Sequence, residues 1–287
     1  MTEASQRQPV RAVRGPLSAS GWIPLERGYP AVMGILNVTP DSFSDGGKFL
    51  DPKRAIVQAE RMIADGADII DIGAESTRPY GGQLPVSADD EISRLRPVLK
   101  DVVALGTPVS IDTMKPVVAR FALDAGASIV NDVWGLQRDG EMARIVATYS
   151  APLVAMHNRE TIDPAIDIMA DIADFFARTL AIADRCGIAR EKIALDPGIG
   201  FGKDAGQSMT ALARLGELHR FGRPLLVGAS RKRFIGSVIA CEPHQRLGGS
   251  LAAHLLAARN GAAIIRAHDV AETVQALRVN AAIEGRR

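Results

Sequence analysis

Short apolar runs alternate with longer amphipathic runs along this chain, beginning near residue 31. The short runs are rich in Val, Ile, Leu and Ala, which is typical of strands buried on both faces. In the longer runs apolar residues recur at spacings of three and four, the pattern of a helix with one buried face. The run 52–65 shows it clearly, with apolar positions at Ala55, Ile56, Ala59, Met62 and Ile63.

The two patterns alternate eight times. The predicted strands span 32–36, 68–72, 108–111, 128–130, 153–156, 192–195, 224–227 and 263–266. The predicted helices span 52–65, 88–105, 115–125, 141–149, 166–186, 206–219, 247–259 and 270–283. Glycine follows three helical runs, at Gly66, Gly126 and Gly261, where a left-handed residue commonly ends a helix.

Strands that alternate with helices predict a parallel sheet covered by helices. Eight such units in about 250 residues match an α/β fold of the (β/α)8 TIM barrel type. The alternative is an open doubly wound sheet, but no GxGxxG sequence opens the first helix. No low-complexity linker divides the chain, so we predict a single barrel domain over 26–287. A short polar N-terminal tail over 1–25 precedes it.

The composition narrows the function classes. Of the 287 residues, 47% are hydrophobic and 23% charged, and the net charge is +1. A balanced charge gives no reason to expect nucleic acid or an anionic membrane surface as a partner. No apolar stretch approaches the length of a membrane span, and the N-terminal region lacks a secretory signal. The widely separated Cys186 and Cys241 favour a reducing, cytoplasmic setting.

Polar residues follow every predicted strand. In a (β/α)8 barrel the carboxyl ends of all strands meet on one face, which carries the chemistry. The first exit is the most elaborate, because six short polar side chains occur within 37–45 and Phe43 stands among them. We therefore predict a catalytic face at the strand exits, which carry Asn37, 73–79, Asp112, Asn131, His157, Asp196, 230–232, Arg266 and His268.

Eight short motifs occur at these exits: NVTPDSFSDGG, ESTRP, SIDT, NDV, MH, LDPGIGFGK, GASRKRFIG and RAHDV. Their order over residues 31–284 resembles the dihydropteroate synthase family. The resemblance implies a (β/α)8 barrel, usually a homodimer, that acts in folate biosynthesis. Members of the family join 6-hydroxymethyl-7,8-dihydropterin diphosphate to p-aminobenzoate and release 7,8-dihydropteroate and diphosphate.

The resemblance also implies residue roles. The pterin diphosphate would be bound by Thr77, Asp112, Asn131, Asp196, Lys232, Arg266 and His268. The p-aminobenzoate would be bound by Phe43, Pro79, Ser230 and Arg231. The implied catalytic set is Arg78, Lys232, Arg266 and His268, and Asn37 is the implied ligand of a Mg²⁺ cofactor.

The chemistry of these residue types agrees with the implied roles. A buried carboxylate such as Asp196 can accept two N–H donors from a pterin edge. A departing diphosphate needs cations and a metal, and Mg²⁺ binds through few protein oxygens. Other roles stay open for three residues. Asp112 could cap the following helix, Phe43 could anchor its loop under the barrel rim, and Arg266 could form a surface ion pair.

The run 198–203, GIGFGK, looks like a phosphate loop. Asp204 follows Lys203 where such a loop needs Ser or Thr, so we predict a flexible lip of the substrate site instead. Segments 158–163 and 204–209 depart from the family's frequent pattern.

Two other functions deserve comparison with the synthase. A pterin-binding methyltransferase barrel would explain Asp112, Asn131 and Asp196, but neither the cationic residues nor the loop around Phe43. A non-catalytic pterin-binding paralogue would be expected to lose parts of the first two loops, and both are intact.

Overall fold

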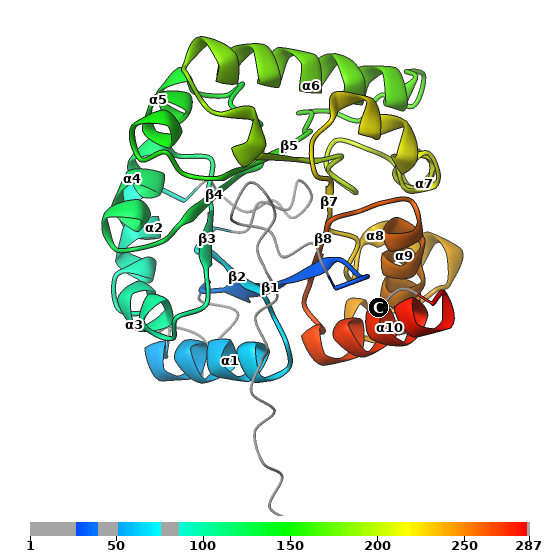
Figure 1. Cartoon of the computed structure of the whole chain (residues 1–287), viewed down its shortest axis with the longest axis horizontal. Helices are drawn as coiled ribbons and strands as arrows, with labels where there is room; N and C mark the ends of the chain where they lie inside the picture. Colours follow the sequence, from blue (N-terminus) through cyan, green and yellow to red (C-terminus); the bar gives the residue numbers. More distant parts are fainter. Residues whose placement is uncertain (1–26, 40–50, 76–85, 286–287) are drawn as a thin grey trace, which may run out of the picture.

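Eight parallel strands form a ring that is surrounded by helices (Figure 1). The structure, a computed structural model, describes residues 27–39, 51–75 and 86–285, so the predicted tail 1–25 lies outside the described residues. The strands are β1 (Ala31–Asn37), β2 (Ile69–Gly73), β3 (Val109–Asp112), β4 (Ile129–Asp132), β5 (Leu153–Met156), β6 (Ile193–Asp196), β7 (Leu226–Val227) and β8 (Ile264–Ala267). All eight predicted strands are confirmed.

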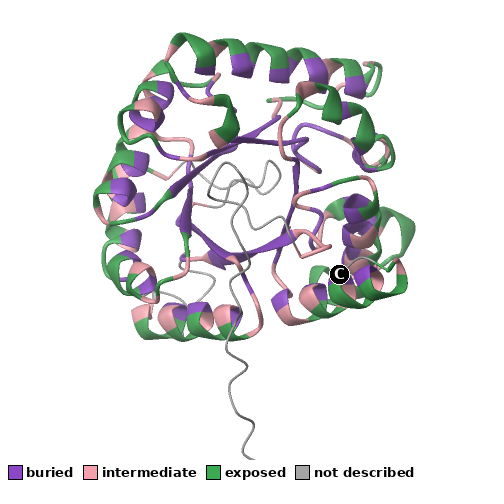
Figure 2. Ribbon diagram, viewed as in Figure 1, coloured by how far each residue is buried: buried purple, intermediate pink, exposed green. Residues whose placement is uncertain are grey.

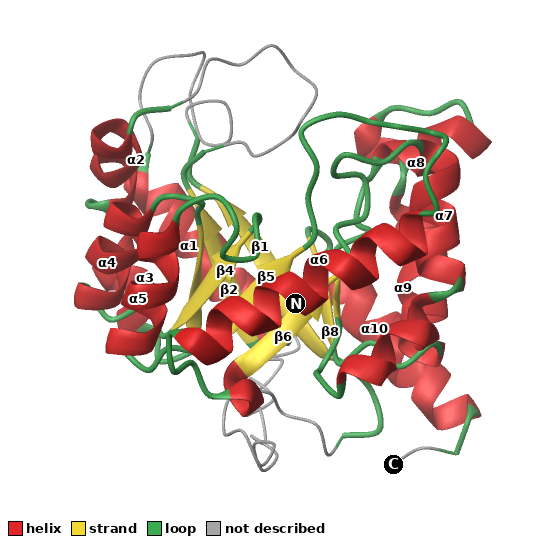
Figure 3. Ribbon diagram, turned by 90° about the horizontal axis from the view of Figure 1, so that it is seen from above, coloured by secondary structure: helices red, strands yellow, loops and turns green. Residues whose placement is uncertain are grey.

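The helices follow the strands in the expected alternation and lie outside the ring (Figure 3). The α-helices are α1 (Pro52–Ala64), α2 (Ala88–Leu95), α3 (Leu99–Ala104), α4 (Pro116–Asp124), α5 (Gly140–Thr148), α6 (Ile168–Arg185), α7 (Ala205–Ala213), α8 (Arg233–Val238), α9 (Leu247–Arg259) and α10 (Val270–Ile283). Three short 3-10 helices are η1 (Arg190–Lys192), η2 (Leu215–Phe221) and η3 (Pro243–Gln245). Within the described residues, no helix is both long and apolar enough to cross a membrane.

The sheet closes on itself. Strand β1 pairs with both β2 and β8, and the order continues without a break from β2 to β6 and from β8 to β7. A parallel bridge between Leu195 and Leu225 joins the two remaining edges, with Leu195 N donating to Pro224 O at 2.9 Å. A closed ring confirms the barrel and excludes the open doubly wound sheet.

The inside of the barrel consists of an apolar layer followed by a polar one. Successive side chains of a strand point to opposite faces, so residues two apart share the inner face. The apolar cluster inside the ring comprises Ala31, Met33, Ile69, Ile129, Val154, Ala194, Leu226 and Ile264. Two residues further along five of these strands stand Asp71, Asn131, Asp196, Gly228 and Arg266. The strand sequence itself therefore delivers polar groups to the carboxyl end of a dry barrel.

A second, larger core lies between the strands and the helices. The strands are buried except at Asn37 and Arg266, whereas the helices are buried on one side and exposed on the other (Figure 2). Phe176 of α6 is fully buried, and its ring meets Phe175 and Phe221 edge-on at centroid distances of 6.4 and 5.7 Å. This packing holds α6 against its neighbours.

Three details differ from the predicted elements. The expected helix 88–105 is two helices, because Pro97 lacks an N–H donor and its ring clashes with the preceding turn. The expected helix 206–219 changes to η2 around Gly216, a poor helix former. Helix α8 was not predicted, since six residues are too few to show helical spacing. The glycine helix ends are confirmed by positive φ angles, such as 101° at Gly66 and 103° at Gly126.

Phe176→Ala should lower the free energy of unfolding by about 3–5 kcal/mol, because it removes a fully buried ring from a packed cluster. Urea unfolding measures the change. The control Val57→Ala removes an apolar side chain that is 61% exposed and should stay within about 0.5 kcal/mol of the parent. Equal losses in the two variants would contradict this packing.

Candidate active site

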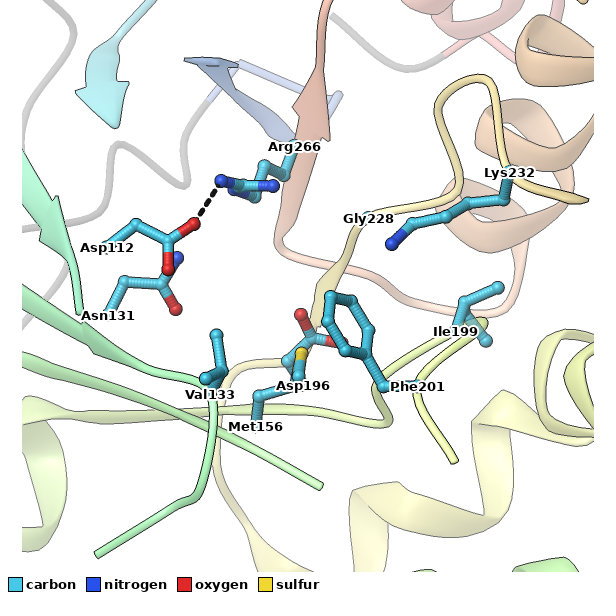
Figure 4. Close-up of a pocket in the computed structure, with 10 residues that line it drawn as sticks. All are labelled: Asp112, Asn131, Val133, Met156, Asp196, Ile199, Phe201, Gly228, Lys232 and Arg266. Carbon is cyan, nitrogen blue, oxygen red and sulfur yellow. Dashed lines mark hydrogen bonds and ion pairs between the residues drawn. The ribbon is translucent and has the colours of Figure 1, made fainter. Parts of the chain in front are cut away.

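A small pocket opens at the carboxyl end of the barrel, where the polar inner layer lies (Figure 4). It is lined by Asp112, Asn131, Val133, Met156, Asp196, Ile199, Phe201, Gly228, Lys232 and Arg266. Five of these were predicted site residues, drawn from strand exits that are distant in sequence: Asp112, Asn131, Asp196, Lys232 and Arg266. The fold therefore brings five of the seven predicted pterin-binding residues together around one cavity.

Arg266 is the central cation of the pocket. Its Nε donates to Asp71 Oδ2 and its Nη2 to Asp112 Oδ2, each at 2.6 Å. Burial disfavours the guanidinium charge, but the carboxylates of Asp71 and Asp112 outweigh burial and raise the pKa of Arg266. The alternative of a surface ion pair is wrong, because Asp71 is fully buried and the Arg266 side chain is only 17% exposed.

Asp112 keeps one oxygen available for a ligand. Within the described residues its buried Oδ1 has no hydrogen-bond partner, which costs free energy unless a bound molecule donates to it. The capping alternative is wrong, since α4 is N-capped by Lys115 without a side-chain bond. Burial, strengthened by the charge of Asp71 and opposed by Arg266, raises the pKa of Asp112 to about 7. Asn131 Nδ2 donates to Asp71 Oδ2 at 3.1 Å and completes this cluster.

Asp196 lies on the other side of the cavity. Its carboxylate is 4% exposed, and Oδ1 accepts a hydrogen bond from Gly198 N at 2.7 Å. Burial raises the pKa of Asp196 to about 6, although the Gly198 N–H and the cations Lys232, Arg266 and Lys203 lower it. The group is therefore largely ionised near neutral pH and can accept N–H donors from a ligand.

Apolar walls complete the pocket between its two acidic sides. Val133, Met156, Ile199 and Phe201 face the cavity, and the Lys232 side chain extends toward it (Figure 4). Lys232 Nζ lies 4.1 Å from the centroid of the Phe201 ring, a cation–π distance. Flat apolar walls with carboxylates and a cation at the rim suit a planar heterocycle with polar edges.

Ser230, Arg231 and His268 lie beside this pocket rather than in its lining. Ser230 Oγ accepts from His268 N at 3.2 Å and lies 3.0 Å from His268 Nδ1, so the structure joins these two predicted residues. Arg231 adopts a left-handed backbone with φ 56°, and its guanidinium forms a two-point ion pair with Asp269. The exits of β7 and β8 are thus tied together.

Asn37 ends β1 and is half-buried, opposite Gly73 in the register. Among the described ranges, no group of three or more His, Cys, Asp or Glu side chains could hold a metal ion. A single amide oxygen fits a Mg²⁺ ion that keeps several waters and takes its remaining ligands from a substrate. The predicted residues Phe43, Thr77, Arg78 and Pro79 lie outside the described residues.

Asp71 and Phe201 are two of the residues around the pocket that sequence reasoning missed. Asp71 stands inside the strand sequence IIDIG, and its place two residues after the inward Ile69 is the signal that could have revealed it. Phe201 lies in GIGFGK, the run predicted to be a flexible lip. The run does line the pocket through Ile199 and Phe201, but it is not a loose lip, because Ile199, Phe201 and Lys203 are only 1%, 8% and 3% exposed.

Comparisons with known proteins agree with this site. The model of a family described as pterin binding enzyme matches residues 33–268. A dihydropteroate synthase of Escherichia coli strain K12 is 45% identical over 262 residues, covering 89% of this chain and 92% of that protein. A dihydropteroate synthase of Clostridium difficile, crystallised with pteroic acid, is 47% identical, with a TM-score of 0.86 and coverage of 91% and 99%. One from Xanthomonas albilineans, with 4-aminobenzoic acid, is 43% identical, with a TM-score of 0.87 and coverage of 94% and 98%.

A (β/α)8 barrel with an acidic, apolar-walled pocket at its carboxyl face defines an enzyme that binds a flat heterocycle. The chain belongs to the pterin-binding enzyme family. Within that family its relatives place it among the dihydropteroate synthases, which are transferases of folate biosynthesis.

Asp112→Asn should change how stability depends on pH. The pKa of Asp112 is about 7 in the folded protein, against 3.8 for an ordinary aspartate. Between these values the folded state keeps a proton that the unfolded chain has released, so the free energy of unfolding falls as pH rises through this window. The variant lacks this titration, so its free energy of unfolding should increase relative to that of the parent as pH rises. Urea unfolding at about pH 5 and pH 8 tests this, and an equal difference at both values would contradict it.

Proposed function

We propose that this barrel joins (7,8-dihydropterin-6-yl)methyl diphosphate to p-aminobenzoate and releases 7,8-dihydropteroate and diphosphate. The observation that carries the proposal is the pocket in which Asp112, Asn131, Asp196 and Lys232 surround apolar walls. Its relatives agree, since one was crystallised with pteroic acid and another with 4-aminobenzoic acid.

The pterin end is recognised by groups that already point into the cavity. Asp196 accepts N–H donors from the pyrimidine edge, because its carboxylate is buried and largely ionised. Asp112 accepts a further donor at its unpartnered Oδ1. Lys232 donates to the ring carbonyl or an adjacent nitrogen, and Asn131 can both donate and accept.

The diphosphate end lies toward β1, β2 and β8. Two carboxylates already share the charge of Arg266, so we assign Arg266 chiefly to holding Asp112 while its remaining N–H donors meet the leaving group. We assign His268 and Arg78 to binding the diphosphate oxygens. Asn37 would bind the Mg²⁺ ion, which when present neutralises charge on the departing diphosphate.

The reaction is a substitution at the methylene carbon of the pterin. The carbon–oxygen bond breaks, its electron pair leaves with diphosphate, and the amine lone pair of p-aminobenzoate forms the new carbon–nitrogen bond while the amine loses a proton. No protein nucleophile takes part, so the residues act by positioning and by stabilising charge. We assign Ser230, Arg231, Phe43 and Pro79 to the p-aminobenzoate.

We also propose a homodimer in the cytoplasm. The three α-helices that follow β7 and β8 each carry exposed apolar side chains, namely Val238 of α8, Leu256 of α9, and Val279 and Ile283 of α10. Such side chains favour burial against a second copy. Cys186 and Cys241 are free thiols, as is typical of the reducing cytoplasm.

Diphosphate release tests the proposed reaction directly. The purified protein, Mg²⁺, dihydropterin diphosphate and p-aminobenzoate together should release diphosphate and form dihydropteroate. Leaving out p-aminobenzoate should suppress dihydropteroate formation. No product with both substrates present would overturn the proposal.

Asp196→Asn should weaken binding of 6-hydroxymethylpterin by about 100-fold or more, because it replaces charge-assisted hydrogen bonds with neutral ones. Isothermal titration calorimetry measures the affinity. Asp184→Asn is the matched control, since Asp184 pairs with Arg190 on the exposed surface of α6. The role given to Asp196 fails if the two variants bind the pterin equally well.

Asn37→Ala should raise the Mg²⁺ concentration needed for half-maximal diphosphate release by about tenfold, because a ligand oxygen is lost. The control Asn280→Ala lies on the outer helix α10 and should leave the Mg²⁺ requirement unchanged. An unchanged requirement in Asn37→Ala would remove Asn37 from the proposed metal site.

A further inference from the structure

A chain of polar contacts runs behind the pocket wall, through side chains that the proposed reaction does not use. Lys203 Nζ lies 2.6 Å from His157 Nδ1, and His157 Nε2 lies 2.9 Å from Asp171 Oδ2. Arg159 Nη1 lies 2.9 Å from the other carboxylate oxygen, Asp171 Oδ1. Lys203 is 3% exposed and His157 is fully buried, whereas Asp171 is partly exposed on α6.

Each proton in this chain has a defined place. Lys203 Nζ also donates to Gly198 O at 3.0 Å and to Phe201 O at 3.1 Å. An ammonium group has three hydrogens, so the charged form of Lys203 satisfies all three acceptors. His157 Nδ1 then accepts, which places the ring proton on Nε2, where it is donated to Asp171. That hydrogen bond lowers the pKa of Asp171 to about 2, so its carboxylate stays ionised.

These contacts hold the loop that forms one pocket wall. Gly198, Gly200 and Gly202 have φ angles of 66°, 80° and 56°, which side chains rarely adopt. The loop also lies close against the exit of β5, since a Cβ on Gly198 would lie 1.9 Å from His157 O. Ile199 and Phe201 line the cavity, whereas Lys203 is buried and is not part of the lining.

The same lysine acts on the two charged groups that meet the pterin. The hydrogen bond from Lys203 to Phe201 O holds Phe201 in position. The ring of Phe201 in turn contacts Lys232 Nζ. The positive charge of Lys203 is one of those that lower the pKa of Asp196. Both effects reach the substrate only through other residues.

We propose that Lys203, His157 and Asp171 form a positioning relay for the pterin half of the site, in which Lys203 holds the loop carbonyls of Gly198 and Phe201 and so fixes the Phe201 wall of the pocket. The relay rests on the proposed function, because it assigns Asp196 and Lys232 to the pterin. The lysine of this sequence, which resembles a phosphate loop, bonds to two loop carbonyls and to His157.

The charges around Lys203 decide the expected pH effect. Asp196 on β6 and Asp171 on α6 favour its ammonium form, whereas Lys232 and Arg159 oppose it, and burial lowers its pKa to about 7. The ammonium is therefore present where Asp196 titrates, at a pKa of about 6. Removing it should raise the pKa of Asp196 and move the acid limb of pterin binding to higher pH.

Lys203→Met tests the relay, with Lys192→Met as the matched control. Lys192 Nζ also bridges to a backbone carbonyl, Ser150 O at 2.6 Å, but it lies before β6, at the opposite end of the barrel. Lys203→Met should raise KM for the pterin diphosphate about tenfold and leave KM for p-aminobenzoate within about twofold. The half-point of the acid limb of 6-hydroxymethylpterin binding should move to higher pH. Lys192→Met should change none of these quantities.

Two results would overturn the relay: a folded Lys203→Met protein with unchanged pterin KM and acid limb, or an equal rise of both KM values. If Lys203→Met does not fold, Asp171→Asn decides, because its site is partly exposed. A pterin KM raised about threefold in that variant supports the relay, and an unchanged one overturns it. The parent's own diphosphate release tests the proposed function separately. If the parent protein releases no diphosphate, the affinities of parent and variants for 6-hydroxymethylpterin still test the relay.

Discussion

The ion pairs between Arg266 and the two buried carboxylates of Asp71 and Asp112 determine the geometry of the site. They connect β8 with β2 and β3 inside the barrel, where neither a lone guanidinium nor a lone carboxylate would be tolerated. Three charged groups in such a space must hold one another at fixed positions. The position of Asn131 depends on this arrangement, because its side-chain amide donates a hydrogen bond to Asp71. Within the described part of the chain, the second carboxylate oxygen of Asp112 has no hydrogen-bond partner, so it is available to a ligand.

The barrel itself could be read from the sequence with few errors, because parallel strands buried on both faces produce continuous apolar runs. The errors have local causes. Pro97 stops a helix whose apolar spacing continues beyond it, and α8 is too short to show spacing at all. Asp71 was not predicted, because a single aspartate within an apolar strand does not indicate a site unless it is known to face the inside of the barrel. Which residues end a strand was readable, but which of them face inward required the alternation inside the ring.

The candidate site could be predicted as a set of residues and not as a set of contacts. Asp112, Asn131, Asp196, Lys232 and Arg266 do share one cavity. The bond of Ser230 to His268 and the pairing of Arg231 with Asp269 join the exits of the consecutive strands β7 and β8. Each pair is 38 residues apart in the sequence, so no local pattern indicates these contacts. The burial of Lys203 was equally hidden, because GIGFGK has the same letters whether its lysine faces a ligand or the protein.

The pocket lies across the joint that closes the ring. Strand β7 has two residues, and the bridge of Leu195 with Leu225 joins it to β6. Asp196 ends β6, and Ile199 and Phe201 follow it on one side of this joint, while Gly228 and Lys232 follow β7 on the other. A small separation of β6 from β7 would break fewer backbone hydrogen bonds than the same separation of two fully paired strands. The two walls of the cavity can therefore adjust their spacing around a rigid, flat ring while the rest of the barrel stays closed. The weakest strand pair of the barrel is thus also the one beside the pocket.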